Sequence, residues 1–370
     1  MKYSLIAVAA FFGCVIASCS GSKDAESNKV PVFDMAANIS VEETPALEVK
    51  DFACTQLSGD EEDAFFRRAN ILDVVGDTVV LIENTPEVSR LIMFNIKDGQ
   101  YLGQINHRGQ GPGEYNIIAG AFVDSNDGTV LIPNFNSPAV YKYALATDSL
   151  VATIEREYVM TMIPPIGGTS SCINVAVPSP DGLEIAQYNV GYQRIDSVSI
   201  PGFQGGNFNM LWGNAGVNGV FMDGDTIYAL SPGVMTPLSV LSQGDYALTN
   251  EKDQDITMKI MTSGESEIEM LKPYIIVRDV QFTDGKMLLT SMHDGVKYSD
   301  LYDMADGKLI YRSVYSQLPK PSEIKVVTED GKTIEIERLF AKDGKWYGII
   351  SESADAVAAD ANSSIVSFIL

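Results

Sequence analysis

The sequence predicts an all-β protein, and three observations support this: many glycines, recurrent turn dipeptides and short apolar runs. The 370-residue chain contains 31 glycines, while patterns typical of helices are scarce. Hydrophobic residues make up 45% of the composition, which is enough to bury a large core. All-β chains of this length often fold as one domain, so length alone does not require two.

One repeated unit organises the chain and is clearest over residues 101–143. In this unit a strand ends in a glycine loop at residues 109–113, and a turn of Asp and Gly follows at 127–128. An apolar run at 129–132 and an alternating strand at 140–143 complete the unit. Turn residues between short strands of this kind are typical of antiparallel sheets.

The turn of Asp and Gly followed by an apolar strand occurs six times. The copies lie at residues 76–77, 127–128, 181–182, 223–225, 284–285 and 343–344. A spacing of about 40–60 residues is that of propeller blades. We therefore predict a six-bladed β-propeller with four-stranded blades over residues 46–370. Two separate sandwiches would show a linker and two families of spacing, and the sequence shows neither.

Both ends of the predicted propeller contain strand patterns. A first strand near residues 46–49 is expected to join the last blade and close the ring, and residues 363–370 are expected to form a final strand. The polar segment 251–269 is either an amphipathic excursion or a set of long loops.

The N-terminus has the pattern of a lipoprotein signal peptide. Residues 1–18 place an apolar stretch after Lys2, too short for a comfortable membrane span, and end in small residues before Cys19. We predict cleavage and acylation at Cys19, which would anchor the chain to a membrane. Residues 19–45, rich in polar residues with little periodicity, are predicted to be a flexible tether.

The stretch GPGEY followed by AFVDSNDGTVLIPNFNSPAVYKY resembles the repeat of NHL-type propellers. It is more similar still to the TolB-like six-bladed propeller lipoproteins abundant in Bacteroidota. NHL repeats usually carry a proline where this chain has residues 118–120, which makes that kinship distant. In lipoproteins of this kind an Asp after the lipidated Cys signals inner-membrane retention. Ser20 therefore implies the outer membrane, on its periplasmic or cell-surface side.

The glycine loop carries the most specific candidate binding residues: Arg108, Gln110, Glu114 and Tyr115. Glycines allow backbone N–H groups to converge on an anion, and Arg108 would add positive charge. The alternative is that Arg108 and Glu114 form an ion pair that fixes the junction between two blades. The loop lacks the Lys-Ser/Thr of a phosphate-binding P-loop.

Asn134 and Asn136 follow an apolar strand and could face the channel, where six-bladed lactonases bind calcium. No matching set of ligands from other blades is apparent, so no cofactor is expected and calcium is the one candidate. The acidic turn at residues 124–128 lacks EF-hand spacing and is expected to be a polar turn. His107 and His293 are not spaced for a zinc site.

Aromatic residues gather in a Gly- and Asn-rich region at Tyr188, Tyr192, Phe203, Phe208 and Trp212. Their rings would suit a sugar or a peptide, or would pack beneath a long insertion. An exported compartment permits a disulfide between the two cysteines at positions 54 and 172, and two buried free thiols are the alternative.

These observations favour a non-catalytic, outer-membrane-anchored propeller of the cell envelope that binds a protein, peptide or glycan. The alternatives are a calcium-dependent lactonase-like hydrolase acting at the channel mouth and a structural accessory of an envelope complex. A formal net charge of −23 excludes nucleic acid as a partner. A large apolar patch on one face would favour binding, whereas a ring of acidic and amide side chains would favour catalysis.

Overall fold

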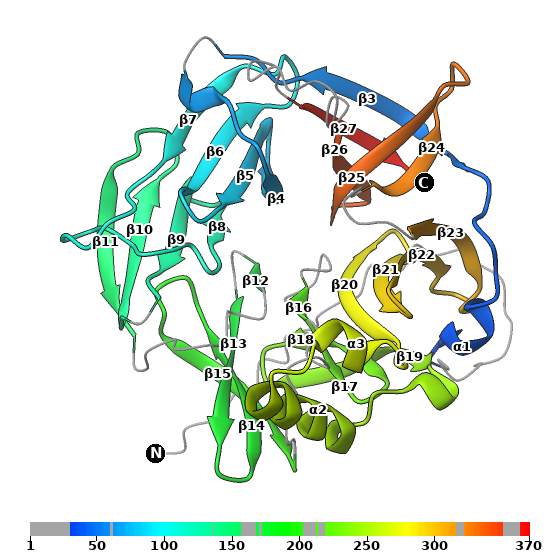
Figure 1. Cartoon of the computed structure of the whole chain (residues 1–370). Coiled ribbons are helices and arrows are strands. Elements are labelled where there is room, and N and C mark those ends of the chain that lie inside the picture. Colours follow the sequence, from blue (N-terminus) through cyan, green and yellow to red (C-terminus); the bar gives the residue numbers. More distant parts are fainter. Residues whose placement is uncertain are drawn as a thin grey trace, which may run out of the picture.

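The computed structural model describes residues 30–59, 62–135, 137–156, 168–169, 172–202, 212–213, 219–315, 322–350 and 363–370. Six sheets stand around a central opening, and each contains at least four strands (Figure 1). The predicted six-bladed β-propeller is therefore confirmed.

The blades follow one another along the chain. Blade 1 contains β4 (Ala69–Val75), β5 (Thr78–Asn84), β6 (Ser89–Asn95) and β7 (Tyr101–Ile105). Blade 2 contains β8 (Phe122–Asp124), β9 (Thr129–Pro133), β10 (Ala139–Ala144) and β11 (Leu150–Glu155). Blade 3 contains β12 (Gly168–Thr169), β13 (Cys172–Ser179), β14 (Gly182–Tyr188) and β15 (Arg194–Pro201). Blade 4 contains β16 (Trp212–Gly213), β17 (Val220–Asp223), β18 (Thr226–Ser231) and β19 (Val234–Ser242). Blade 5 contains β20 (Ile276–Thr283), β21 (Lys286–His293), β22 (Val296–Asp303) and β23 (Leu309–Tyr315).

Blade 6 closes the ring by combining the two ends of the chain. It contains β24 (Ser322–Val327), β25 (Thr333–Lys342), β26 (Lys345–Ile350) and β27 (Ser364–Ile369). The N-terminal strand β3 (Lys50–Gln56) pairs with β27 in antiparallel fashion, and the two-residue β2 (Leu47–Glu48) pairs with β24. The predicted closure of the last blade by an N-terminal strand is thus confirmed.

The turns of Asp and Gly lie where the repeat predicts, between neighbouring strands of each blade. In blades 5 and 6 both turn residues have positive φ, 51° and 69° at residues 284–285 and 50° and 77° at 343–344. This conformation matches the twist of a hairpin and favours glycine at its second position. In blades 3 and 4 a two-residue strand, β12 or β16, precedes the strand that enters the turn. These are the blades that depart most from the repeat.

Among the described residues, six apolar clusters each lie between two neighbouring blades, and a seventh, smaller one lies under α2. Successive residues of a strand point to opposite faces of its sheet. In β5, for example, Val79 and Leu81 pack against blade 6, whereas Val80 packs against blade 2. Strands that are buried on both faces must be apolar throughout, which explains the continuous hydrophobic runs in the sequence.

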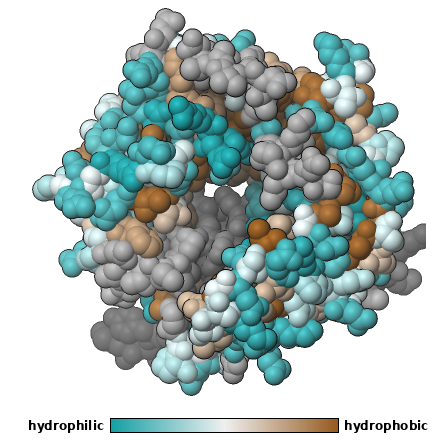
Figure 2. All heavy atoms as spheres, in the orientation of Figure 1, coloured by the Kyte–Doolittle hydropathy of each residue, from teal (hydrophilic) through white to brown (hydrophobic). Residues whose placement is uncertain are grey.

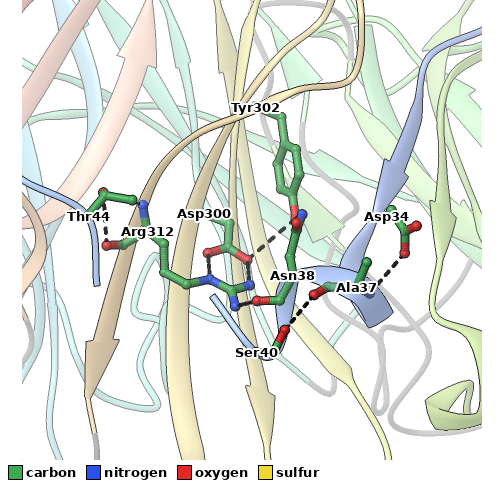
Figure 3. Close-up of polar contacts among 8 residues, drawn as sticks. All are labelled: Asp34, Ala37, Asn38, Ser40, Thr44, Asp300, Tyr302 and Arg312. Carbon is green, nitrogen blue, oxygen red and sulfur yellow. Dashed lines mark hydrogen bonds and ion pairs between the residues drawn. The ribbon is translucent and has the colours of Figure 1, made fainter. Parts of the chain in front are cut away.

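The N-terminal segment corrects one prediction, because residues 30–45 pack on the ring. Strand β1 (Val32–Asp34) extends blade 4 by parallel pairing with β19, and α1 (Met35–Asn38) follows it. The Asn38 carbonyl accepts a hydrogen bond from the Arg312 side chain, and Thr44 exchanges hydrogen bonds with the Arg312 backbone (Figure 3). The described part of the predicted tether is therefore a strap across blades 4 and 5.

Two helices interrupt the β architecture between blades 4 and 5. After the short 3-10 helix η2 (Gly244–Tyr246), α2 (Asn250–Ser263) and α3 (Glu267–Leu271) lead into β20. The other 3-10 helix in the described residues is η1 (Glu62–Ala64), between β3 and β4. The segment 251–269 thus forms the amphipathic excursion, the first of its two predicted alternatives.

Candidate functional site

The glycine loop binds a carboxylate of its own. The backbone N–H of Gly111 donates to Glu114 Oε2 at 2.7 Å. The backbone N–H of Gly109 donates to the carbonyl of Tyr115 at 3.0 Å, and a Cβ at position 109 would collide with the Glu114 carboxylate. The loop needs glycine at position 109 because Glu114 folds back over it. The Glu114 carboxylate therefore accepts a hydrogen bond from a backbone N–H that, in the predicted anion site, would bind an external anion.

The predicted ion pair between Arg108 and Glu114 does not form. Nη1 of Arg108 donates instead to the carbonyl of Pro86 at 2.9 Å, in the loop between β5 and β6. Arg108 and Gln110 are exposed, whereas Glu114 is turned into its own loop. The two charges diverge because the glycines reverse the chain between them.

Tyr115 is a core residue that fixes the junction of blades 1 and 2. Its ring is fully buried, and its hydroxyl donates to the carbonyl of Ile105 at 3.1 Å while accepting from the His107 backbone at 3.2 Å. Burial raises the pKa of Tyr115 to about 12, so its hydroxyl remains a donor at neutral pH. Its ring meets Tyr143 edge-on, with 6.4 Å between centroids.

His107 belongs to the same junction. Its ring stacks on Tyr143 with 4.9 Å between centroids, and Nε2 lies 2.8 Å from Oδ1 of Asp148 in the turn after β10. Tyr143 in turn donates to the carbonyl of Gly113. Together these contacts make the glycine loop a packed connection between two blades.

The predicted asparagine site is only partly described. Asn134 is buried, and its Oδ1 accepts from the backbone of Asn116 at 3.2 Å, so its side chain ties one loop to another. Asn136 lies outside the described residues. In the nearby acidic turn, Asp127 binds Lys142 and Thr129, as expected of a polar turn. Within the described ranges, no group of three or more His, Cys, Asp or Glu side chains could hold a metal ion.

The aromatic region divides between core and undescribed residues. Tyr188 and Tyr192 are buried with 5.9 Å between ring centroids, in the cluster that joins blades 2 and 3. Of the two roles expected for these rings, ligand binding or packing, Tyr188 and Tyr192 have the packing role. Trp212 belongs to β16, next to Phe221 in register, while Phe203 and Phe208 lie outside the described residues.

Of the cysteines, Cys19 lies outside the described residues. Cys54 is exposed on β3 and Cys172 is buried, and both are free thiols. The expectation of two buried thiols therefore holds for Cys172 alone.

None of the helices in the described part of the chain is long and apolar enough to cross a membrane.

The α2–α3 excursion exposes the apolar surface that the sequence did not single out. Met258, Met261 and Ile268 are 59%, 72% and 58% exposed, the three highest values among the large hydrophobic residues described. We call these three side chains the helical surface. Figure 1 shows α2 and α3 on the viewer's face of the ring, with α3 beside the central opening. Figure 2 shows the same face with all heavy atoms as spheres.

The opposite side of α2 holds this surface in place. Ile256 is buried with Leu248, Leu271 and Ile276 in a small cluster, and Ile260 packs against it. The helix begins at the N-cap Thr249 and ends at Gly264, whose φ of 69° is typical of a helix C-cap. These two caps were the signal in the sequence that could have located the helix.

A pocket adjoins the helical surface beneath α3. Ile268 and Leu271 of α3 form one wall, and Ile276 and Met292 of blade 5 form the other. Arg278 and Glu267 lie at the same pocket, with 3.7 Å between Nη2 and Oε1. The pocket offers mainly apolar surface, and Lys272 and Asp294 line it together with Arg278 and Glu267.

Comparisons with known proteins agree on the fold. Residues 52–165, less than half of the chain, match the DUF5128 family, described as a 6-bladed beta-propeller. No curated protein matches the chain. The chain is similar to the structure of a Bacteroides fragilis protein described as exported, with 15% identity, a TM-score of 0.60, and coverage of 87% of this chain and 98% of that one. A DUF4221 family member from Bacteroides vulgatus has 11% identity and a TM-score of 0.49, with 87% and 97% covered.

Fold and exposed surface together define the class of the protein. It is a six-bladed β-propeller that carries a helical excursion on one face, with large apolar side chains open to solvent. At 15% identity the Bacteroides fragilis structure supports the fold and leaves function to the site.

Proposed function

We propose that this protein is a non-catalytic binding propeller of the cell envelope and that it binds a polypeptide at the helical surface. The observation that carries the proposal is the exposure of Met258, Met261 and Ile268 beside an apolar pocket. Two of the three lie on α2 and the third on α3. Exposed apolar side chains that gather in one region mark interaction sites, whereas scattered ones do not. Methionine suits such sites because its flexible thioether adapts to different partners.

A polypeptide fits this surface better than a glycan. The three exposed side chains are aliphatic or thioether groups, which pack against apolar side chains of a partner. Glycan sites generally need aromatic faces, and Tyr188 and Tyr192 are buried in the core.

The proposal includes the membrane anchor at Cys19. The lipoprotein pattern of residues 1–19 supports it, and we extend to this chain the exported character given for the similar Bacteroides fragilis protein. Because the Pro31 carbonyl already bonds to Val240 of blade 4, only residues 20–30 separate the anchor from the ring. Such a stretch reaches at most about 40 Å. An anchored propeller would therefore stay close to the membrane.

Site-specific photocrosslinking in cells that produce the full chain tests the binding role. A photoreactive amino acid at position 261 is expected to give one discrete crosslinked polypeptide. The same group at Val151, which is 55% exposed on blade 2, is the control and is expected to give none. Met258→Ser with Ile268→Ser should abolish the product. Equal crosslinking from positions 151 and 261 would contradict the proposal.

Fractionation of the same cells tests the anchor. The Cys19→Ala variant should leave the membrane fraction and remain folded, as judged by circular dichroism. If it stays in the membrane fraction after an alkaline wash, the anchor lies elsewhere.

A further inference from the structure

The exposed stripe of α2 combines acidic and thioether side chains. Glu251, Asp255, Met258 and Met261 are all exposed and follow one another at intervals of four, three and three residues. Residues at these spacings lie on one face of a helix. Ile256 and Ile260, which pack toward the ring, lie on the opposite face. A partner that covers the methionines must therefore also meet the carboxylates.

The excursion as a whole is acidic. Residues 244–275 contain seven Asp and Glu against three Lys. Two of the lysines are already paired, Lys259 with Asp255 at 2.6 Å and Lys272 with Glu269 at 2.7 Å. The third, Lys252, lies over the ring of Tyr274, with 5.2 Å from Nζ to its centroid. The positive charges of the excursion are thus engaged within it.

Three exposed carboxylates of residues 244–275 have no ion-pair partner among the described residues: Asp245 in η2 and two that lie on either side of the methionines. Glu251 and Glu265 form no ion pair with any residue in the described part of the chain. Glu251 precedes Met258 by two helical turns on the same stripe, and Glu265 lies just beyond Gly264 at the C-terminal end. Negative charge therefore lies at both ends of the exposed methionine pair.

The acidic charge of the excursion and its exposed apolar side chains together limit the class of partner that can bind there. An anionic lipid surface would be repelled by this stripe and by the net charge of −23. A segment with apolar side chains on one face and Lys or Arg around them would satisfy both features at once. The pocket beneath α3, with Leu271, Ile276 and Met292 in its walls, would accept one apolar side chain of such a segment.

We propose that the occupant of the helical surface is a cationic amphipathic polypeptide segment, bound through its apolar face by the methionines and α3 pocket and through its basic groups by the acidic stripe. This rests on the proposed binding function and specifies its partner class. It also makes the binding dependent on salt, because ion pairs at an exposed rim are screened.

Synthetic probes test the partner class directly. The protein is the mature chain carrying Cys19→Ser, so that no acyl group competes with the probe. Fluorescein-labelled peptides of about 14 residues are long enough to form a helix on binding. One is an amphipathic Leu/Lys peptide, the second its Leu/Glu counterpart, and the third a Lys/Ser peptide without apolar residues. Fluorescence anisotropy gives each dissociation constant.

The Leu/Lys peptide is expected to bind at least tenfold more tightly than either of the others, and more weakly as salt is raised. Met258→Ser/Met261→Ser/Ile268→Ser should weaken it at least tenfold, and so should Glu251→Gln/Asp255→Asn. The matched controls are Glu42→Gln/Glu329→Gln, which removes two exposed charges elsewhere, and Leu102→Ser/Val151→Ser, which removes exposed apolar groups. Neither control should change binding. Circular dichroism confirms that every variant folds.

Several outcomes would overturn the inference. If the Lys/Ser peptide binds as tightly as the Leu/Lys peptide, binding is simple attraction to an acidic protein. If the Leu/Glu peptide binds as tightly as the Leu/Lys peptide, the charge of the partner does not affect binding. Binding to phosphatidylglycerol vesicles in preference to the Leu/Lys peptide would mean a membrane surface instead. If crosslinking from position 261 persists while the Leu/Lys peptide fails to bind, the binding function stands and the cationic partner class is wrong.

Discussion

Arg312 and Asp300 form a bidentate ion pair inside blade 5. Nε of Arg312 donates to Oδ1 at 2.7 Å and Nη2 donates to Oδ2 at 2.6 Å, and the two side chains are 2% and 0% exposed. The third guanidinium nitrogen donates to the Asn38 carbonyl of the N-terminal strap (Figure 3). One buried charge pair thus joins neighbouring strands of the blade to a segment from the other end of the chain.

Breaking this pair is expected to destabilise the fold strongly. Arg312→Met should lower the free energy of unfolding by about 3–5 kcal/mol, because Asp300 would be left as an uncompensated buried charge. The exposed pair of Lys332 and Asp330 offers the control, and Lys332→Met should change the free energy of unfolding far less than Arg312→Met does. Urea unfolding measures both.

A double variant separates charge burial from packing. Asp300→Leu combined with Arg312→Met should be less destabilising than Arg312→Met alone, since no unpaired charge remains. If Arg312→Met loses no more stability than Lys332→Met, the ion pair between Arg312 and Asp300 does not have the structural role that its burial indicates.

The strap should contribute to stability through Phe33. Its ring is fully buried and stacks on Tyr302 with 4.3 Å between centroids. Phe33→Ala is expected to lower the free energy of unfolding by about 3–5 kcal/mol. The neighbouring Val32 is 48% exposed, so Val32→Ala should cost less than about 1 kcal/mol. Equal, small losses in urea unfolding would mean that the strap is a loose tether after all.

The repeat and the ring could be read from the sequence because their signals are local. A turn such as that at residues 284–285 and the apolar run after it lie within about ten residues of each other, and their repetition sets the number of blades. The strap could not be read in this way. Thr44 and Arg312 lie 268 residues apart, and the few apolar residues near Phe33 show no periodicity.

The candidate site was predicted less well than the fold, for two reasons. Arg108 and Glu114 were expected to pair from their proximity in sequence, but the glycines between them turn Glu114 back onto Gly111. The exposure of Met258 and Met261 depends on which face of α2 packs against the ring. Only the folded position of Ile256 shows which face that is.

The glycine loop should tolerate loss of Arg108 better than addition of a methyl group. Arg108→Ala removes one exposed hydrogen bond and should cost less than about 1 kcal/mol. Gly109→Ala should cost about 1–3 kcal/mol, because the new Cβ would collide with the Glu114 carboxylate. Adding Glu114→Ala to Gly109→Ala should restore part of the loss in thermal or urea unfolding. A large loss of stability for Arg108→Ala alone would contradict this expectation and support the predicted structural role of the Arg108 charge.

Asp279, at an irregular position in β20, should make stability depend on pH. Burial raises the pKa of this carboxyl to about 6, although Gln281 donates a hydrogen bond to it at 3.3 Å and Lys297 favours its charged form. The folded chain therefore holds a proton that the unfolded chain has released above its ordinary pKa of about 3.9. By linkage, this group lowers the stability of the fold as pH rises from about 4 to about 6.

Replacing the carboxyl by an amide should remove that penalty. Asp279→Asn is expected to match the wild type near pH 4 and to exceed it at pH 7.5 by about 1–3 kcal/mol, with most of the gain developing between pH 4 and 6. Urea unfolding of both proteins across this range measures the difference, and Asp245→Asn in the exposed 3-10 helix η2 controls for removal of one negative charge. A difference that does not vary with pH would show that Asp279 ionises in the fold as readily as in the unfolded chain. The carboxylate would then be held by Gln281 and Lys297 strongly enough to offset its burial.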